Sequence, residues 1–182
     1  MSYPLKSIAY FSQKSVDVGA RQKDAESLEP IRKPHLPFEL SIKNGLTVNS
    51  WLIMTATPFT NAHAFYINFL YGSEYFFHFR VDFPRGKQQG AVVRNTTMNN
   101  LWQKEEREIS EFPFIAGITF DMNFRFESHK VMVFVNGDYF TKFEYRGNVS
   151  LDDVNRMTIM GDLMVQKLHL KISKEDQTKV VV

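Results

Sequence analysis

The stretch 75–83, which reads YFFHFRVDF, decides the fold class because apolar and polar residues alternate along it. Successive side chains of a β-strand point to opposite faces, so a period of two predicts one buried face and one solvated face. The apolar face would carry Phe77, Phe79, Val81 and Phe83. The polar face would carry His78, Arg80 and Asp82. One face of this strand therefore belongs to a core, and the other is a candidate recognition surface.

Similar short runs of Phe, Ile, Val, Leu and Thr continue from Pro37 onward, with turn residues about every 8–12 positions. No amphipathic helix of useful length separates them, and 17 phenylalanines suit the pleated surface of a β-sheet core. The pattern predicts an all-β sandwich or barrel and disfavours a βαβ nucleotide-binding layout. The other strands are expected within 51–57, 64–71, 91–96, 124–140 and 156–173.

Two turns are expected inside the stretch 124–140. The first is Glu127-Ser128-His129-Lys130, and the second is Asn136-Gly137. Asn and Gly tolerate the positive φ angles that a two-residue hairpin turn requires. The sequence therefore predicts antiparallel hairpins here.

The two ends of the chain differ in composition from the body. Residues 1–36 alternate charges with Ser, Gln and Gly, and Pro30, Pro34 and Pro37 are expected to interrupt any regular element. We expect residues 1–36 to form a flexible or loosely docked extension, with at most a short helix across Lys23 to Leu28. The recognition domain is expected to cover residues 37–174, followed by a tail at 175–182.

Composition excludes several classes of protein. The 182 residues hold no cysteine, which removes disulfide frameworks and cysteine-ligated zinc. No apolar run is long enough to span a membrane, and the first residues do not resemble a secretion signal, so a cytoplasmic protein is expected. Residues 37–182 carry 16 Lys/Arg and 16 Asp/Glu, a neutral balance that disfavours nucleic-acid binding.

Polar residues on the predicted strand face and in the loop that follows could bind a sugar. An indole ring packs against the C–H face of a pyranose, and planar polar side chains bind adjacent hydroxyls in pairs. The alternative is an ordinary salt-bridged sheet face with one half-exposed Trp. The candidate residues are His78, Arg80, Asp82, Asn95, Trp102, Glu105 and Arg107.

The chain resembles the galectins, the β-galactoside-binding lectins, over roughly residues 37–173. WQKEERE (102–108) matches the family's W-x-x-E-x-R core, and FFHF (76–79) and VVRN (92–95) supply its His and Asn positions without insertion or deletion. Further similarity lies in FYINF (65–69), FPFIAGITF (112–120), VFVNGDYFTKFEYR (133–146) and IMGDL (159–163).

The resemblance implies an all-β jelly-roll sandwich of two antiparallel sheets that binds galactose-containing glycans on a concave sheet face. In the family a Trp stacks on galactose, a role that falls here on Trp102. His78 and Asn95 would be hydrogen-bonding groups, and Glu105 with Arg107 would form the paired polar end. No role is catalytic, and no cofactor or metal is implied.

The sequence departs from the family at two positions of this strand. The family reads H-x-N-x-R where this chain reads His78-Phe79-Arg80-Val81-Asp82. Arg donates only and an ionised Asp accepts only, so the hydroxyl-binding pattern is altered. We expect a rewired network of Arg80, Asp82, Glu105 and Arg107 that recognises a different glycan or fills the sugar position itself.

Other kinds of protein share some of these sequence features. A galectin-like protein-interaction module that has lost most lactose binding is the main alternative. An intracellular lipid-binding barrel is disfavoured, because that family has an early helical lid and this sequence shows no such helix. No G-x-S-x-G elbow or metal-ligand spacing suggests an enzyme or a zinc site. Galectins often dimerise and reach the cell exterior without a signal peptide, so a homodimer and an extracellular role are both open.

Overall fold

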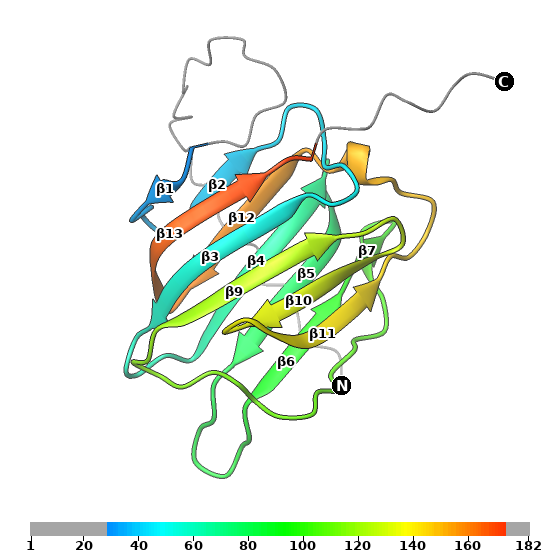
Figure 1. The fold of residues 1–182 in the computed structure, drawn as a ribbon. Coiled ribbons are helices and arrows are strands. Elements are labelled where there is room, and N and C mark those ends of the chain that lie inside the picture. The colour runs from blue at the N-terminus through cyan, green and yellow to red at the C-terminus, as the bar shows by residue number, and fades with distance from the viewer. Residues whose placement is uncertain (1–28, 174–182) are drawn as a thin grey trace, which may run out of the picture.

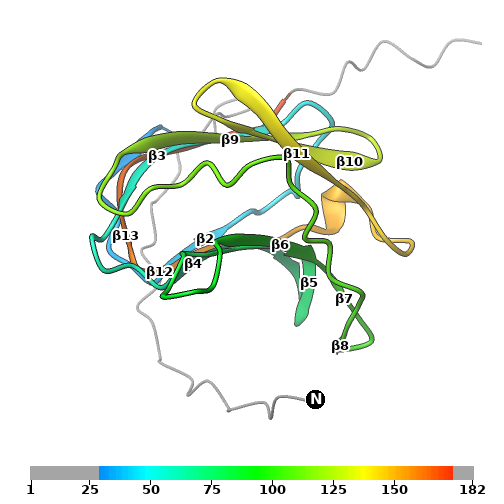
Figure 2. The same ribbon diagram turned by 90° about the horizontal axis from the view of Figure 1, so that it is seen from below.

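The computed structural model describes residues 29–173, and the predicted helix across Lys23 to Leu28 lies outside them. The described chain folds into two antiparallel sheets that pack face to face (Figures 1 and 2). The larger sheet has the order β1 (Ile31–Arg32), β13 (Leu163–Lys171), β3 (Trp51–Pro58), β9 (Phe120–Phe126), β10 (Lys130–Val135) and β11 (Asp138–Glu144). The smaller sheet has the order β2 (Phe38–Ser41), β12 (Arg156–Gly161), β4 (Ala64–Tyr71), β5 (Glu74–Asp82) and β6 (Ala91–Asn95).

Two short elements complete the described chain. A two-stranded ribbon of β7 (Thr97–Met98) and β8 (Leu101–Trp102) follows β6 and projects beside the smaller sheet in Figure 2. A 3-10 turn, η1 (Leu151–Asp153), leads into β12. The predicted all-β sandwich of two antiparallel sheets is confirmed.

Alternation explains how the strands fill the space between the sheets. On β5, Phe77, Phe79 and Val81 are fully buried, as the period of two predicts. The rings of Phe77 and Phe79 meet phenylalanines of the opposite sheet, for example Phe79 against Phe124 with ring centroids 5.3 Å apart. Since burial of an aromatic side chain contributes a large apolar area, this layer of rings dominates the core.

The Asn136-Gly137 turn is confirmed. It joins β10 to β11, and both residues have positive φ, at 53° and 93°. The other predicted turn joins β9 to β10, where the Glu127 N–H donates to the Lys130 carbonyl at 2.8 Å. Both hairpins therefore lie where the turn chemistry indicates.

The stretch 156–173 does not run as one strand. Strand β12 pairs with β2 and β4, whereas β13 pairs with β1 and β3 in the other sheet. Gly161, with φ of 106°, lies at the crossing, and a Cβ there would come within 2.4 Å of the Ala64 carbonyl oxygen. Only glycine fits this close backbone approach, at the point where the chain changes sheets.

The expected extension contains one short strand, which lies between Pro30 and Pro34. Strand β1 pairs with the edge of β13, with Ile31 opposite Leu168 and Arg32 opposite Lys167. The two residues between Pro30 and Pro34 that pair are not prolines, so their N–H groups remain available for a short edge ladder. At least this part of the expected extension is therefore docked on the larger sheet.

Candidate functional site

The outward face of β5 places the predicted polar residues in one row. His78, Arg80 and Asp82 are all partly exposed and alternate with the buried Phe77, Phe79 and Val81. Strand β4 lies on one side of β5, and β6 lies on the other (Figure 1). The row therefore lies within the smaller sheet, flanked by side chains from both neighbours.

His78 is held as a neutral ring. Its Nδ1 lies 2.7 Å from Asn68 Oδ1, and Asn68 Nδ2 donates to Thr158 Oγ1 at 3.0 Å. Burial lowers the pKa of His78 to about 4, and the positive charge of Arg80 adds to this while Glu105 opposes it. Because Asn68 Oδ1 accepts, Nδ1 carries the proton and Nε2 is left as an acceptor for a hydroxyl.

Trp102 stands beside His78 on the β7–β8 ribbon. Its ring centroid lies 4.9 Å from that of His78, in an edge-on arrangement, and 4.8 Å from that of Tyr75. The Asn99-Asn100 turn, with φ of 54° and 59°, closes the ribbon, and Thr97 pairs with Trp102. The indole remains 46% exposed, so part of it is free to contact a ligand.

Arg80 and Asp82 neutralise one another. Arg80 Nε and Nη2 lie 3.0 and 2.9 Å from the same carboxylate oxygen, Asp82 Oδ2. The two residues are two positions apart on one strand face, which brings their side chains together. Asp82 Oδ1 is not used in this pair.

Glu105 and Arg107 form a second, separate pair. Arg107 Nη2 and Nε lie 2.6 and 2.8 Å from Glu105 Oε2. The structure thus brings the four charged residues into two ion pairs and not into one network. Each carboxylate therefore has its own guanidinium as a partner.

Asn95 lies opposite His78 in the pairing of β5 with β6. Its side chain is only 2% exposed, and its amide is engaged within the protein. Nδ2 donates to the Gln103 carbonyl at 2.8 Å, while Oδ1 accepts from the Thr96 N–H at 2.9 Å. Asn95 therefore fixes the start of the loop that leads to Trp102, and a direct role toward a sugar stays a prediction.

No group of three or more His, Asp or Glu side chains in residues 29–173 is arranged to hold a metal ion. In the same range, no helix is long and apolar enough to cross a membrane.

Residues 37–170 match the family model described as galactoside-binding lectin. The chain belongs to the galectin family. This is a family of lectins, which agrees with the expectation of a non-enzymatic protein, and the predicted resemblance is confirmed.

The chain is similar to several galectins. It is 31% identical to galectin-6 of Mus musculus over 91% of this chain and 53% of the relative. It is also 31% identical to a 32 kDa beta-galactoside-binding lectin of Haemonchus contortus, over 75% of this chain and 46% of the relative. The chain spans about half the length of the curated relatives it matches.

Among solved structures, the fold is similar to that of the galectin LEC-6 of Caenorhabditis elegans. The TM-score is 0.69 at 26% sequence identity, and the match covers 78% of this chain and 94% of the other. The sandwich is therefore a galectin fold.

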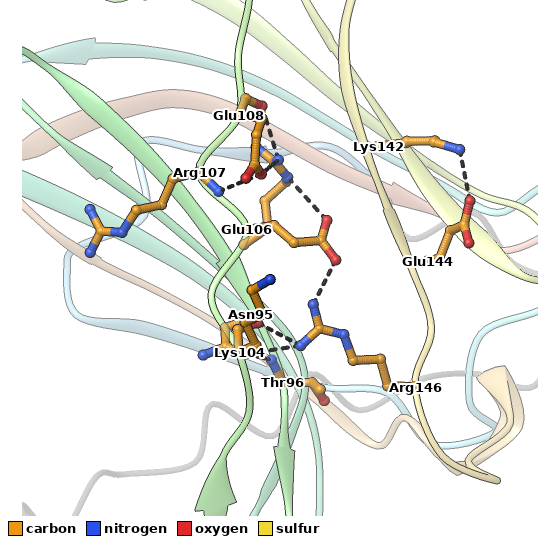
Figure 3. Close-up of polar contacts among 10 residues, drawn as sticks. Asn95, Thr96, Lys104, Glu106, Arg107, Glu108, Lys142, Glu144 and Arg146 are labelled. Carbon is orange, nitrogen blue, oxygen red and sulfur yellow. Dashed lines mark hydrogen bonds and ion pairs between the residues drawn. The ribbon is translucent and has the colours of Figure 1, made fainter.

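Sequence reasoning missed the residues that hold the 103–108 segment of this galectin in place. Backbone hydrogen bonds of 2.9 Å join Arg94 and Glu106 in both directions, so the segment lies along the edge of β6. Glu106 lies between Glu105 and Arg107, and its carboxylate accepts from Arg146 Nη2 at 2.6 Å (Figure 3). The Glu106 side chain therefore anchors the backbone that carries the candidate sugar-binding residues Glu105 and Arg107.

Two arginines complete this anchor. Arg146 Nη1 donates to the Lys104 carbonyl at 2.7 Å, and its guanidinium lies over the Phe143 ring at 4.9 Å.

Arg94 is 3% exposed, and its Nη2 donates to the Glu108 carbonyl at 3.0 Å. Burial lowers the pKa of Arg94, with the carboxylates of Glu106 and Glu108 opposing the shift. These long-range partners had no sequence signal, because nothing in the local pattern joins position 146 to position 106.

Proposed function

We propose that this galectin binds galactose-containing glycans on the outer face of its smaller sheet, with a specificity altered by Arg80 and Asp82. The observation that carries the proposal is the half-exposed Trp102 ring beside a neutral His78 whose Nε2 can accept a hydroxyl hydrogen bond. A stacking plate next to a hydrogen-bonding row is the arrangement that a pyranose needs. The match to the galactoside-binding lectin family supports galactose as the sugar.

Replacing Trp102 with alanine should lower glycan binding at least tenfold. The indole supplies the apolar contact of a shallow and hydrated site, where each hydroxyl contact contributes little net affinity. A glycan array probed with the purified wild type and the Trp102→Ala variant, with lactose as soluble competitor, measures this.

Tyr139→Ala is the matched control, because Tyr139 is also an exposed aromatic residue but lies on β11 of the other sheet. Signal that depends on Trp102 and that lactose removes identifies a galactoside lectin. Signal that depends on Trp102 but not on lactose identifies a changed specificity. Equal signal from the wild type and Trp102→Ala would contradict the proposed site.

The double variant Arg80→Asn with Asp82→Arg should bind lactose about tenfold more tightly than the wild type. In the wild type these two side chains bind one another, so a sugar must compete with an ion pair. Asparagine restores a group that both donates and accepts, and arginine at position 82 restores a guanidinium beside the site's polar end. Calorimetric titration with lactose measures the change.

The control exchanges a similar pair on the larger sheet, outside the row of candidate residues. Lys142 and Glu144 are two positions apart on β11, and their ion pair is 2.7 Å long. Lys142→Asn with Glu144→Arg changes the net charge by the same amount and should leave lactose binding unchanged. No gain in the Arg80/Asp82 double variant would count against altered specificity at these positions.

A second candidate function is a protein-interaction module that has lost most lactose binding. The two ion pairs favour it, because Arg80, Asp82, Glu105 and Arg107 are all satisfied without a sugar. Loss of all Trp102-dependent glycan signal would favour this function over the first. For either function, the proposal includes a homodimer. It also includes action in the cytosol or outside the cell.

A further inference from the structure

A hollow adjoins the candidate site at the end away from Trp102. It has a volume of about 520 Å³, and Asp82 and Arg107 of the site form part of its wall. The turn after β5 and the loop before β4 provide the rest, including Arg85, Gln88, Gln89 and His63. We call it the basic hollow. The four residue steps from His78 to Asp82 span about 13 Å along β5, so the hollow begins roughly one disaccharide length from Trp102.

The charges around the basic hollow do not balance. Arg80 and Arg107 are paired with Asp82 and Glu105. Arg85 and Lys87, on the turn that forms the rim, have no carboxylate within ion-pairing distance among residues 29–173. The hollow therefore keeps an excess positive charge even though one of its walls is an aspartate.

The turn that carries Arg85 is built in a fixed geometry. The Arg85 N–H donates to the Gln88 carbonyl at 3.0 Å, and the Gln88 N–H donates back to the Arg85 carbonyl at 2.9 Å. Gly86, with φ of 57°, supplies the left-handed residue that this tight turn needs. Arg85 Nη1 also donates to His63 Nδ1 at 3.3 Å, which steadies the guanidinium at the edge of the hollow.

We infer that the basic hollow receives an acidic substituent, a sulfate or a carboxylate, on the sugar that follows galactose in the bound glycan. This inference rests on the proposed function, with galactose over Trp102, and it directs the next sugar along the row toward Asp82 and Arg107. The guanidinium of Arg85 offers a fork of donors that matches an oxyanion, and the Gln88 and Gln89 amides add neutral donors. The carboxylate of Asp82 would not repel the anion strongly, because Arg80 neutralises it.

Binding of small probes tests the inference. The sulfate probe is lactose sulfated at O6 of glucose, compared with lactose, and the carboxylate probe is lactobionate, compared with the neutral lactitol. The wild type should bind at least one acidic probe about fivefold more tightly than its neutral partner. Arg85→Gln should remove this gain and leave lactose binding unchanged.

Lys87→Gln is the matched variant, since it removes the same charge from the same turn but Lys87 does not line the hollow. It should keep most of the gain. A gain with only one acidic probe assigns the hollow to sulfate or to carboxylate. Absence of any gain, a gain that survives Arg85→Gln, or an equal loss in Lys87→Gln would overturn the inference.

Lactose sulfated at O3 of galactose serves as the misplaced probe and should show no Arg85-dependent gain. Such a gain would refute the assignment to the second sugar. Failure of the inference is distinct from failure of the proposed function. Lactose binding that depends on Trp102, with no gain for the acidic probes, removes only the inference. Absence of Trp102-dependent binding for every probe removes both.

Discussion

Replacing Phe77 with alanine is expected to lower the free energy of unfolding by about 3–5 kcal/mol. Phe77 is fully buried, and its ring centroid lies 5.2 Å from that of Phe143 and 5.9 Å from that of Phe124, both in the opposite sheet. It also contacts Phe79 and Phe69 within its own sheet. The truncation therefore removes a ring from the centre of the layer that joins the two sheets.

The expected loss is large compared with the total stability of a typical domain, about 5–15 kcal/mol. Urea unfolding followed by tryptophan fluorescence measures it. Phe59→Ala is the control, because Phe59 is 50% exposed and its truncation should change the free energy by less than about 0.5 kcal/mol. A change below about 1 kcal/mol for Phe77→Ala would show that the core closes around the missing ring.

The same strand shows what the sequence could and could not predict. Alternation along β5 placed Phe77 in the core and His78 outside, because the pleat of a strand enforces a period of two. The Asn136-Gly137 turn was equally predictable, since few other dipeptides accept two positive φ angles. Such features depend on neighbours in the sequence, so a single sequence contains them.

The features that escaped prediction depend on tertiary contacts. The anchoring of Glu106 by Arg146 joins residues 40 positions apart. The need for glycine at position 161 follows from the approach of the Ala64 backbone, which no local pattern indicates. Within the candidate site, the residue types and the shared strand face were predictable, whereas the division of four charges into two ion pairs was settled only by the side-chain geometry.

The free energy of unfolding should fall by about 3 kcal/mol between pH 6.5 and pH 4 because of His78 alone. The pKa of His78 is about 4 in the folded protein and about 6.5 when the side chain is free in water. Between these two pKa values, His78 binds a proton in the unfolded chain but not in the folded protein. This part of the free energy of unfolding is therefore fully present above pH 6.5 and is lost as the pH falls toward 4.

The effect of His78 protonation can be separated from ordinary acid denaturation by substituting this residue. Carboxylates also titrate near the lower end of this range, so the useful quantity is the difference between the wild type and His78→Gln in urea unfolding at each pH. Glutamine remains neutral, so the variant should lose this part of the pH dependence. His129→Gln, in the turn between β9 and β10, should keep the wild-type dependence.

The same protonation links stability to recognition. Below its pKa, His78 would carry protons on both ring nitrogens, and Nε2 could no longer accept a hydroxyl hydrogen bond. Binding that uses this acceptor should therefore persist to about pH 5 and weaken near pH 4, a range in which an ordinary histidine would already be charged. An NMR titration of the His78 ring with a midpoint near 6.5, or equal pH dependence of unfolding in the wild type and His78→Gln, would refute the neutral state of His78 on which this argument depends.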